Sequence, residues 1–462
     1  MNAVPRSWRA VLLLSVVAVA CSPRRVREDD QPQPMISLPR TAEDSAKAPP
    51  QPVQPPQPEM PRDEAPLLRS EGARDVRVAL ATAAQGAVLS GTGAFRVFDS
   101  RNAVLVRARS PDAWTVERRG RQLRAVRQGT ATSWSDGMLT LRSDREDEFG
   151  VFAGQRFRGV IRVVASDTGI VVVNVLPLEW YLRGVVPLEI GGPRAGNEEA
   201  AVEAQAIAAR SYTVVRLAAT EGGSSRNTSY DLLSSVADQV YGGADAERPF
   251  SNQAVARTAG LVLRYGGRVV SAPYHSTCGG ETAAPDEVWR AGNEPFLQRV
   301  SDRIPGTADR FYCDLSPRFS WTRSFTAAEL DAAVKAYLAG YTTVPPGGAG
   351  HVRGAAVESR TASGRVARLV LAAERGNFAL RGNDIRYVLR APGGEILNST
   401  YFSVQTESSR DGGLARLVVK GNGYGHGVGM CQWGAIGRAR AGQSARTILA
   451  TYYPGTTVGL MN

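Results

Sequence analysis

Apolar residues recur with two different periods along this chain. From Val76 to Val175 they alternate with polar residues in short runs separated by Gly, Asp, Asn and Ser, a pattern typical of half-buried β-strands. Strand signals return between Val366 and Val418. The first region predicts strands at Val76–Leu80, Ala94–Phe98, Val104–Ala108, Met138–Arg142, Phe157–Ala165 and Ile170–Val175.

Helical patterns interrupt these β-rich segments. Glu198–Ala218 is rich in alanine, follows Asn197 as an N-cap and has glutamates in its first turn, which predicts a closely packed helix. Thr326 begins another helix, because it can form a capping box with Glu329. Further patterns predict a helix at Asn252–Ala259, a hairpin of 261–264 and 268–273 across Gly266 and Gly267, and a last helix at Ala445–Tyr452.

Helices that are inserted between β-rich segments, rather than alternating with strands, indicate the α+β class. We expect a β-rich N-terminal part with an inserted helix-containing catalytic region, after a disordered tether. The predicted divisions are a signal peptide at 1–21, a Pro-rich linker at 22–68, a β-rich subdomain at 69–165 and a catalytic core at 166–462. Loops at 221–228 and 345–350 are expected to be flexible.

The N-terminus has the features of an export signal. Arg6 and Arg9 precede a short apolar run at 10–20, which is too short to span a bilayer as a helix. The run ends in Ala18-Val19-Ala20-Cys21, which resembles a bacterial lipobox and predicts lipidation of Cys21. The alternative is an ordinary secretory signal cleaved near Ala20. The lipidated form predicts a periplasmic, membrane-anchored protein of the cell envelope, at the outer membrane if the bacterium has one.

The linker and the net charge add little to the predicted domain organisation and partners. Residues 22–68 contain 12 of the 27 prolines and are expected to remain extended, with a reach of roughly 140 Å. The net charge is +11, which favours anionic partners. The basic residues are scattered and form no compact run, so we expect no nucleic-acid partner.

A glycine-rich segment at 423–435 is the clearest candidate for chemistry. Five glycines in twelve residues suit tight turns or a backbone that approaches a ligand closely. The side chains between them include Tyr424, His426 and Gln432, which suit contact with a polar ring. The alternative is a turn whose histidine and tryptophan cap a core.

Three other segments combine polar and aromatic residues in the same way: 179–189, 205–212 with 238–243, and 274–282 followed by Trp289. With 423–435 and the closing Tyr452–Thr456, they stand in the order seen in the stage II sporulation protein D / LytB (amidase enhancer) family. The chain resembles this family over about 75–458. The resemblance implies action on bacterial peptidoglycan. The best-known member is a lytic transglycosylase that cleaves glycan strands stripped of stem peptides, whereas others enhance amidases without catalysis of their own.

Glu189 is the predicted catalytic residue. A lytic transglycosylase needs one group that acts first as acid and then as base, whereas a hydrolase usually needs a second carboxylate. The apolar residues at 185–188 precede Glu189, so desolvation should raise its pKa. It also matches the family's catalytic glutamate, although Ile190 replaces the usual Met. The alternatives are a Glu189 paired with Arg183 or Arg210, and Glu179 as the acid.

The predicted substrate-binding residues come from the same four segments. For Arg210 a structural or charge-tuning role fits better than contact with substrate, and for His426 the alternative is a core histidine. Gln239 and Tyr241 could hydrogen-bond sugar hydroxyls. The full set is Arg210, Tyr212, Gln239, Tyr241, His275, Ser276, Thr282, Tyr424, His426 and Gln432.

Three cysteines remain once Cys21 is set aside. A Cys278–Cys313 disulfide is the preferred prediction outside the cytoplasm, and such a bond would stabilise the fold by roughly 2–4 kcal/mol. The alternative is a zinc ion held by His275, Cys278 and Cys313. Cys431 stands where the family more often has Ser and fits a small buried group.

The sequence therefore predicts a peptidoglycan lytic transglycosylase that requires no cofactor, although zinc remains an open alternative. The competing prediction is a non-catalytic, peptidoglycan-binding enhancer of an amidase. The predicted partners are glycan strands, the membrane through the lipid anchor and, in the second reading, an amidase.

Overall fold

The computed structural model describes residues 75–194, 196–221, 229–410 and 412–461. The signal peptide, the lipidation of Cys21, the linker at 22–68 and the flexible loop predicted at 222–228 lie outside these residues. The described part contains more strand than helix, 37% against 25%, which is consistent with the α+β class. None of its helices combines the length and apolar composition needed to cross a membrane.

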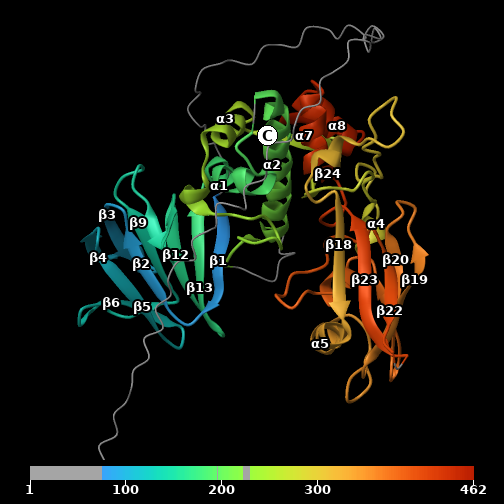
Figure 1. The fold of residues 1–462 in the computed structure, drawn as a ribbon. Coiled ribbons are helices and arrows are strands. Elements are labelled where there is room, and N and C mark those ends of the chain that lie inside the picture. The colour runs from blue at the N-terminus through green and yellow to red at the C-terminus, as the bar shows by residue number, and fades with distance from the viewer. Residues whose placement is uncertain (1–74, 195, 222–228, 411, 462) are drawn as a thin grey trace, which may run out of the picture. The chain divides into compact units, whose positions relative to one another are not determined.

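Two seven-stranded sheets form the first β-rich region (Figure 1). The first sheet runs in the order β14 (Leu232–Leu233), β1 (Val76–Ala84), β13 (Gly169–Leu176), β12 (Val160–Ser166), β9 (Met138–Ser143), β3 (Ala94–Phe98) and β4 (Val104–Arg109). The second contains β11 (Gln155–Phe157), β10 (Gly150–Phe152), β2 (Ala87–Gly91), β5 (Ala113–Arg119), β6 (Gln122–Arg127), β7 (Thr130–Ala131) and β8 (Ser135–Asp136).

Strand β13 is buried along its whole length, because β1 and β12 pair with its edges and its alternate side chains enter hydrophobic clusters on both faces. The six strands predicted in this region are confirmed, with ends that differ by a few residues. The predicted boundary between 165 and 166 falls inside the β12–β13 hairpin, where Ser166 pairs with Gly169. Residues on both sides of that boundary therefore belong to one sheet.

Four helices pack against α2 (Glu199–Glu221), as Figure 1 shows. Its partners are α1 (Leu178–Ile190), α3 (Pro249–Arg257), α7 (Gln432–Arg440) and α8 (Ala445–Tyr452). Close packing is possible because α2 buries small side chains, including Ala201, Ala204 and Ala208. The helices predicted at α2, α3 and α8 are confirmed.

Two small sheets connect distant parts of the chain. Hairpin β15 (Leu261–Tyr265) and β16 (Arg268–Val269) is the predicted one, and β25 (Thr457–Leu460) pairs with β15. Strand β17 (Tyr274–His275) runs parallel to β24 (Met430–Cys431), with His275 opposite Cys431. This short pairing brings the third and fourth motif segments together.

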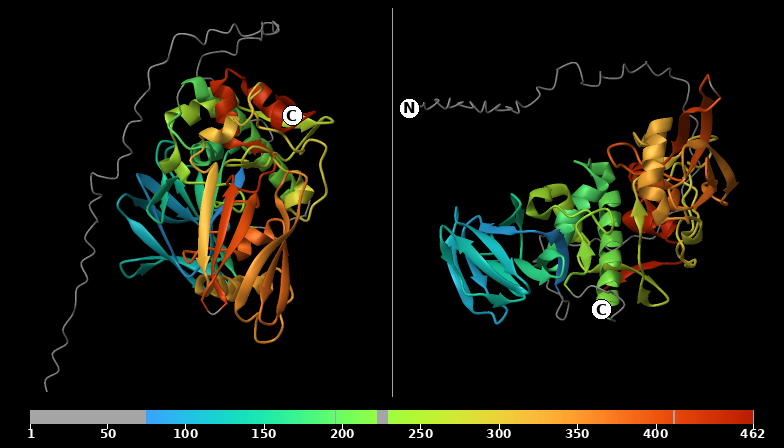
Figure 2. Two further views of the ribbon diagram at one scale, coloured as in Figure 1. Left: turned by 45° about the vertical axis from the view of Figure 1, so that its right-hand side comes forward. Right: turned by 90° about the horizontal axis from the view of Figure 1, so that it is seen from below.

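A second β-rich region contains two three-stranded sheets (Figure 2). They are β18 (Ser320–Thr326), β23 (Leu414–Asn422) and β22 (Phe402–Ser408), and β19 (Val352–Arg360), β20 (Val366–Ala373) and β21 (Gly376–Arg381). Helix α5 (Ala327–Tyr337) has the predicted capping box of Thr326 and Glu329. The region has a hydrophobic core of its own, which includes Phe325, Leu369 and Leu417.

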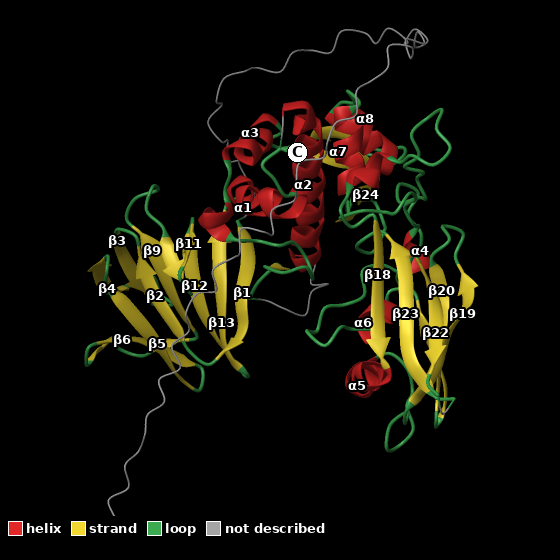
Figure 3. Cartoon of the chain, viewed as in Figure 1, coloured by secondary structure: helices red, strands yellow, loops and turns green. Residues whose placement is uncertain are grey.

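Short helices complete the described part: α4 (Pro285–Val288), α6 (Asp384–Val388) and the 3₁₀ turns Gly196–Glu198, Gly243–Ala246, Tyr312–Leu315 and Leu338–Gly340. Helices α1 and α7 were not predicted. Figure 3 shows both among the other helices, between the two groups of strands. Helix α1 contains Pro187 and α7 contains Gly434 and Gly437, residues that normally argue against a helix.

Candidate active site

Glu189 lies in the last turn of α1, between exposed Leu188 and buried Ile190. The backbone N–H of Val240 donates a hydrogen bond of 2.8 Å to its Oε1. The side chains of Gln432 and Tyr274 also hydrogen-bond to the carboxyl. Burial raises the pKa of Glu189 to about 7, and the three hydrogen bonds oppose that rise.

All four motif segments meet at this carboxyl. Gln432, from α7, donates from Nε2 to Oε1 of Gln205 on α2 at 3.2 Å. The Tyr274 hydroxyl accepts a 3.0 Å hydrogen bond from Nε2 of Gln239. Gln432 and Tyr274 are thus each held by a second residue. The Glu189 carboxyl is therefore positioned by a connected network of hydrogen bonds rather than by a single contact.

The groups around Glu189 are neutral at physiological pH. Burial raises the pKa values of Tyr274 and Tyr181 well above 10, and the negative charge of Glu189 adds to both shifts. Both tyrosines therefore remain protonated. A surrounding of neutral donors permits both the acid and the carboxylate form of Glu189.

The two motif histidines lie side by side. Their ring centroids are 5.5 Å apart, and the ring of Trp289 lies 4.9 Å from that of His426. Burial lowers the pKa of His275 well below 6.5 and that of His426 to about 3, so both rings are neutral. Nδ1 of His275 lies 3.1 Å from the Val428 carbonyl oxygen, which assigns its proton to Nδ1.

Comparison with known proteins identifies relatives of this chain. A family model described as "Stage II sporulation protein" matches residues 166–265, the range that includes Glu189. The stage II sporulation proteins D of Bacillus amyloliquefaciens and Bacillus subtilis are each 30% identical over 294 residues, which are 61% of this chain and 74% of each relative. This chain belongs to the stage II sporulation protein D family.

The resemblance predicted from the four motif segments is thereby confirmed. The amidase enhancer of Bacillus subtilis is also 30% identical, over 306 residues that are 60% of this chain and 40% of the enhancer. The chain thus matches less than half of that relative's length. A second model, described as a domain of unknown function, matches residues 307–429, which include the second β-rich region.

Arg210 lies in a structural ion pair, which agrees with the role that the sequence favoured over contact with substrate. Its side chain is fully buried and forms a bidentate ion pair with Glu179, at 2.7 and 2.8 Å. It also donates to the Leu261 carbonyl oxygen at 3.0 Å. The pair connects α1, α2 and β15, and it argues against Glu179 as the acid and against Arg210 as the ionic partner of Glu189.

Three other residues predicted to contact substrate are buried, and their polar atoms already have hydrogen-bond partners, which favours a structural role. The Gln239 carbonyl oxygen accepts from Tyr181 at 3.0 Å and from Thr213 at 2.8 Å. The Tyr241 hydroxyl donates to Asn174 at 2.7 Å. The hydroxyl of Thr282 donates to the Gln298 carbonyl oxygen and accepts from the Val300 N–H.

The remaining predicted contacts stay predictions. Tyr212 is half-buried and donates to Asp238 at 3.0 Å. Ser276, Tyr424 and His426 are half-buried, and Arg318 lies over the Tyr424 ring at 4.2 Å. Gln432 is nearly buried and turns towards Glu189, which fits a positioning role better than contact with a sugar.

The cysteine prediction needs correction as well. Cys278, Cys313 and Cys431 are all free and buried, so the predicted Cys278–Cys313 disulfide is absent. The two sulfurs lie 3.4 Å apart. Cys431 and Asp302 join them in one cluster, which does not include His275. Sequence reasoning missed Asp302, because nothing in its spacing connects it with the cysteines.

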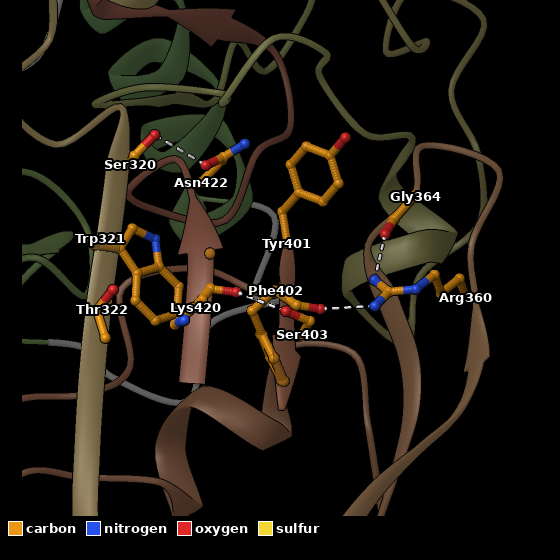
Figure 4. A pocket seen from close by; sticks show the side chains of 11 residues that line it. Ser320, Trp321, Thr322, Arg360, Gly364, Tyr401, Phe402, Ser403, Lys420 and Asn422 are labelled. Carbon is orange, nitrogen blue, oxygen red and sulfur yellow. Dashed lines mark hydrogen bonds between the residues drawn. The ribbon is translucent and has the colours of Figure 1, made fainter. Parts of the chain in front are cut away.

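A hollow of about 790 Å³ lies in the second β-rich region (Figure 4). Trp321, Tyr401 and Lys420 are among the residues that line it, and Glu189 is not. Nε1 of Trp321 donates to the Gly423 carbonyl oxygen at 2.8 Å, so this wall also holds the start of the glycine-rich segment.

Proposed function

We propose that this protein is a peptidoglycan lytic transglycosylase with Glu189 as its acid and base. One observation carries the proposal: a single carboxyl, with a pKa raised to about 7, is held where the four motif segments converge. General acid catalysis is most effective when the pKa of the acid lies near the working pH. The membership of the family supports a role at the cell wall.

The reaction needs no water. The protonated Glu189 gives its proton to the glycosidic oxygen while the bond from that oxygen to C1 of the muramic acid breaks. The resulting carboxylate then takes the proton of the muramic acid C6 hydroxyl, whose oxygen forms a new bond to C1. The products are a shortened strand and a 1,6-anhydromuramic end, and Glu189 is protonated again.

The hydrogen bonds around Glu189 suit this cycle. The Val240 N–H donates to Oε1 at 2.8 Å and stabilises the carboxylate that forms after the first proton transfer. Asp238 is not placed to activate water as a second carboxylate. Its oxygens bind Arg216 at 2.9 Å and the Leu233 N–H at 2.9 Å.

The second candidate is a wall-binding protein that enhances an amidase. The similarity to the Bacillus subtilis amidase enhancer favours it, although the chain matches only 40% of that relative. Both candidates act on glycan strands in the cell envelope. For both we propose a periplasmic protein anchored through a lipid on Cys21.

The test separates the two candidates. The purified protein is incubated with glycan strands that lack stem peptides, and anhydromuramic products are measured by mass spectrometry. We expect products from the wild type, a loss of at least about 100-fold in Glu189→Gln and no change in the surface control Glu358→Gln. If the wild type sediments with peptidoglycan but forms no product, the enhancer function stands and the enzyme proposal fails.

A further inference from the structure

Four side chains of types that can bind a metal converge at one point in the hydrophobic core that also contains Val172 and Tyr452. Cys278, Asp302, Cys313 and Cys431 are each fully buried, and their ligand atoms all lie within 4.8 Å of one another. Sγ of Cys278 is 3.4 Å from Sγ of Cys313 and 3.5 Å from Oδ2 of Asp302. Thiolates and a carboxylate in a buried site need partners of opposite charge.

These distances suit a tetrahedral ion. Zinc binds sulfur at about 2.3 Å and carboxylate oxygen at about 2.0–2.2 Å, so neighbouring ligand atoms around it lie about 3.5–3.8 Å apart. Three thiolates and one carboxylate are a donor set that selects zinc over hard cations such as magnesium.

The surroundings of the cluster are those of a metal site. Oδ1 of Asp302 is held by Tyr452 at 2.6 Å and by Nη2 of Arg438 at 3.0 Å, while Oδ2 lies towards Cys278. Such outer contacts orient a ligand and offset its charge.

Backbone groups also point at sulfur. The N–H groups of Cys278 and Gly434 donate to Sγ of Cys431 at 3.2 and 3.3 Å. N–H donors of this kind stabilise a thiolate in a dry interior.

We propose that Cys278, Asp302, Cys313 and Cys431 form a closed structural site for zinc. The ligand set differs from the one expected from the sequence, because His275 is replaced by Asp302 and Cys431. Four protein ligands leave no position for a substrate or a reactive water, so the ion would be structural.

The position of the site explains what the ion would do. Cys278 follows β17 and Cys431 ends β24, so the ion would fix the pairing that joins the third and fourth motif segments. Gln432, the next residue, contacts Glu189. The ion would therefore hold Gln432 in place, although the proposal does not depend on the catalytic role of Glu189.

Metal content tests the site without any measurement of activity. Full-length protein purified from zinc-supplemented cells is analysed by mass spectrometry for bound metal and, after exchange with cobalt, by absorption spectroscopy. We expect about one zinc per chain and the thiolate-to-cobalt charge-transfer band. Cys313→Ser and Asp302→Asn should lower the zinc content by at least half, whereas His275→Gln should retain it.

Three results would overturn the proposal. The first is wild-type protein without zinc whose three thiols react with an alkylating reagent in the unfolded state. The second is a disulfide between two of the cysteines in freshly purified protein. The third is full zinc content in a folded Cys313→Ser variant. If the variants fail to fold, the cobalt spectrum of the wild type still decides whether thiolates bind the metal.

Discussion

Glu189 has an unusual surrounding for a carboxyl that must ionise. Burial favours its neutral form, whereas the Val240 N–H, Gln432 and Tyr274 favour the carboxylate. The balance leaves the pKa at about 7, where both forms are populated at neutral pH. The sequence indicated the residue through the apolar run before it, but the three donors come from distant segments.

The pH dependence of the reaction follows from this pKa. Glu189 must be protonated to act as the acid, so kcat/KM should fall as the pH rises through about 7. Initial rates between pH 5 and 9 on purified glycan strands measure the profile. An alkaline limb far above pH 8 would assign the acid to another group.

Gln432 should influence the pH at which the activity falls. Its hydrogen bond lowers the pKa of Glu189, so removal of that bond should raise the pKa and shift the alkaline limb to higher pH. We expect this shift in Gln432→Leu. A variant that loses activity equally at every pH would indicate a structural role instead.

At the scale of elements, the α1–α2 contact depends on the Glu179–Arg210 pair. Arg210 is fully buried and its partner is mostly buried, so loss of one charge leaves the other without compensation. Arg210→Ala should lower the free energy of unfolding by about 3–5 kcal/mol. Urea denaturation followed by circular dichroism measures the change.

The matched control is Arg257 on α3, which pairs with Glu199 and Glu203 at the surface. Arg257→Ala should cost at most about 1 kcal/mol, because solvent screens exposed pairs. Similar losses in the two variants would contradict the structural role of Arg210.

Helices α1 and α7, which the sequence did not predict, share one cause. Helices α1 and α7 contain proline and glycine, whose local preference is overridden by tertiary packing. At Gly437 a β-carbon would overlap the Tyr312 carbonyl oxygen, and at Gly434 it would overlap the Tyr452 hydroxyl. These glycines serve close packing inside a helix, and a single sequence does not distinguish that use from a turn.

At the scale of the whole molecule, the described part has two larger hydrophobic cores. The first extends from Val76 to Tyr453, and the second lies within Phe325–Val419. The glycine-rich segment follows β23 of the second core and leads into α7 of the first. Chain segments far apart in sequence therefore build one candidate site.

The location of the whole protein depends on the predicted lipid anchor at Cys21. Replacement of Cys21 by Ala should move the protein from the membrane fraction to the soluble periplasmic fraction, because no acylated cysteine would form. Fractionation followed by immunoblotting measures the change. A Cys21→Ala protein that stays in the membrane fraction would contradict lipidation.

The sequence by itself determined six strands of the first β-rich region, the helices with clear caps and the family, and it pointed to Glu189, because these depend on local periodicity and on residues in fixed order. Only the tertiary structure decided which polar side chains are available to a ligand. Arg210, Gln239 and Tyr241 lie in promising motifs but are buried and paired, whereas Asp302 joins the cysteines from an unremarkable loop. The physical reason is that burial and hydrogen-bond pairing depend on contacts between segments that are more than one hundred residues apart, such as β17 and β24. No local pattern in the sequence records those contacts.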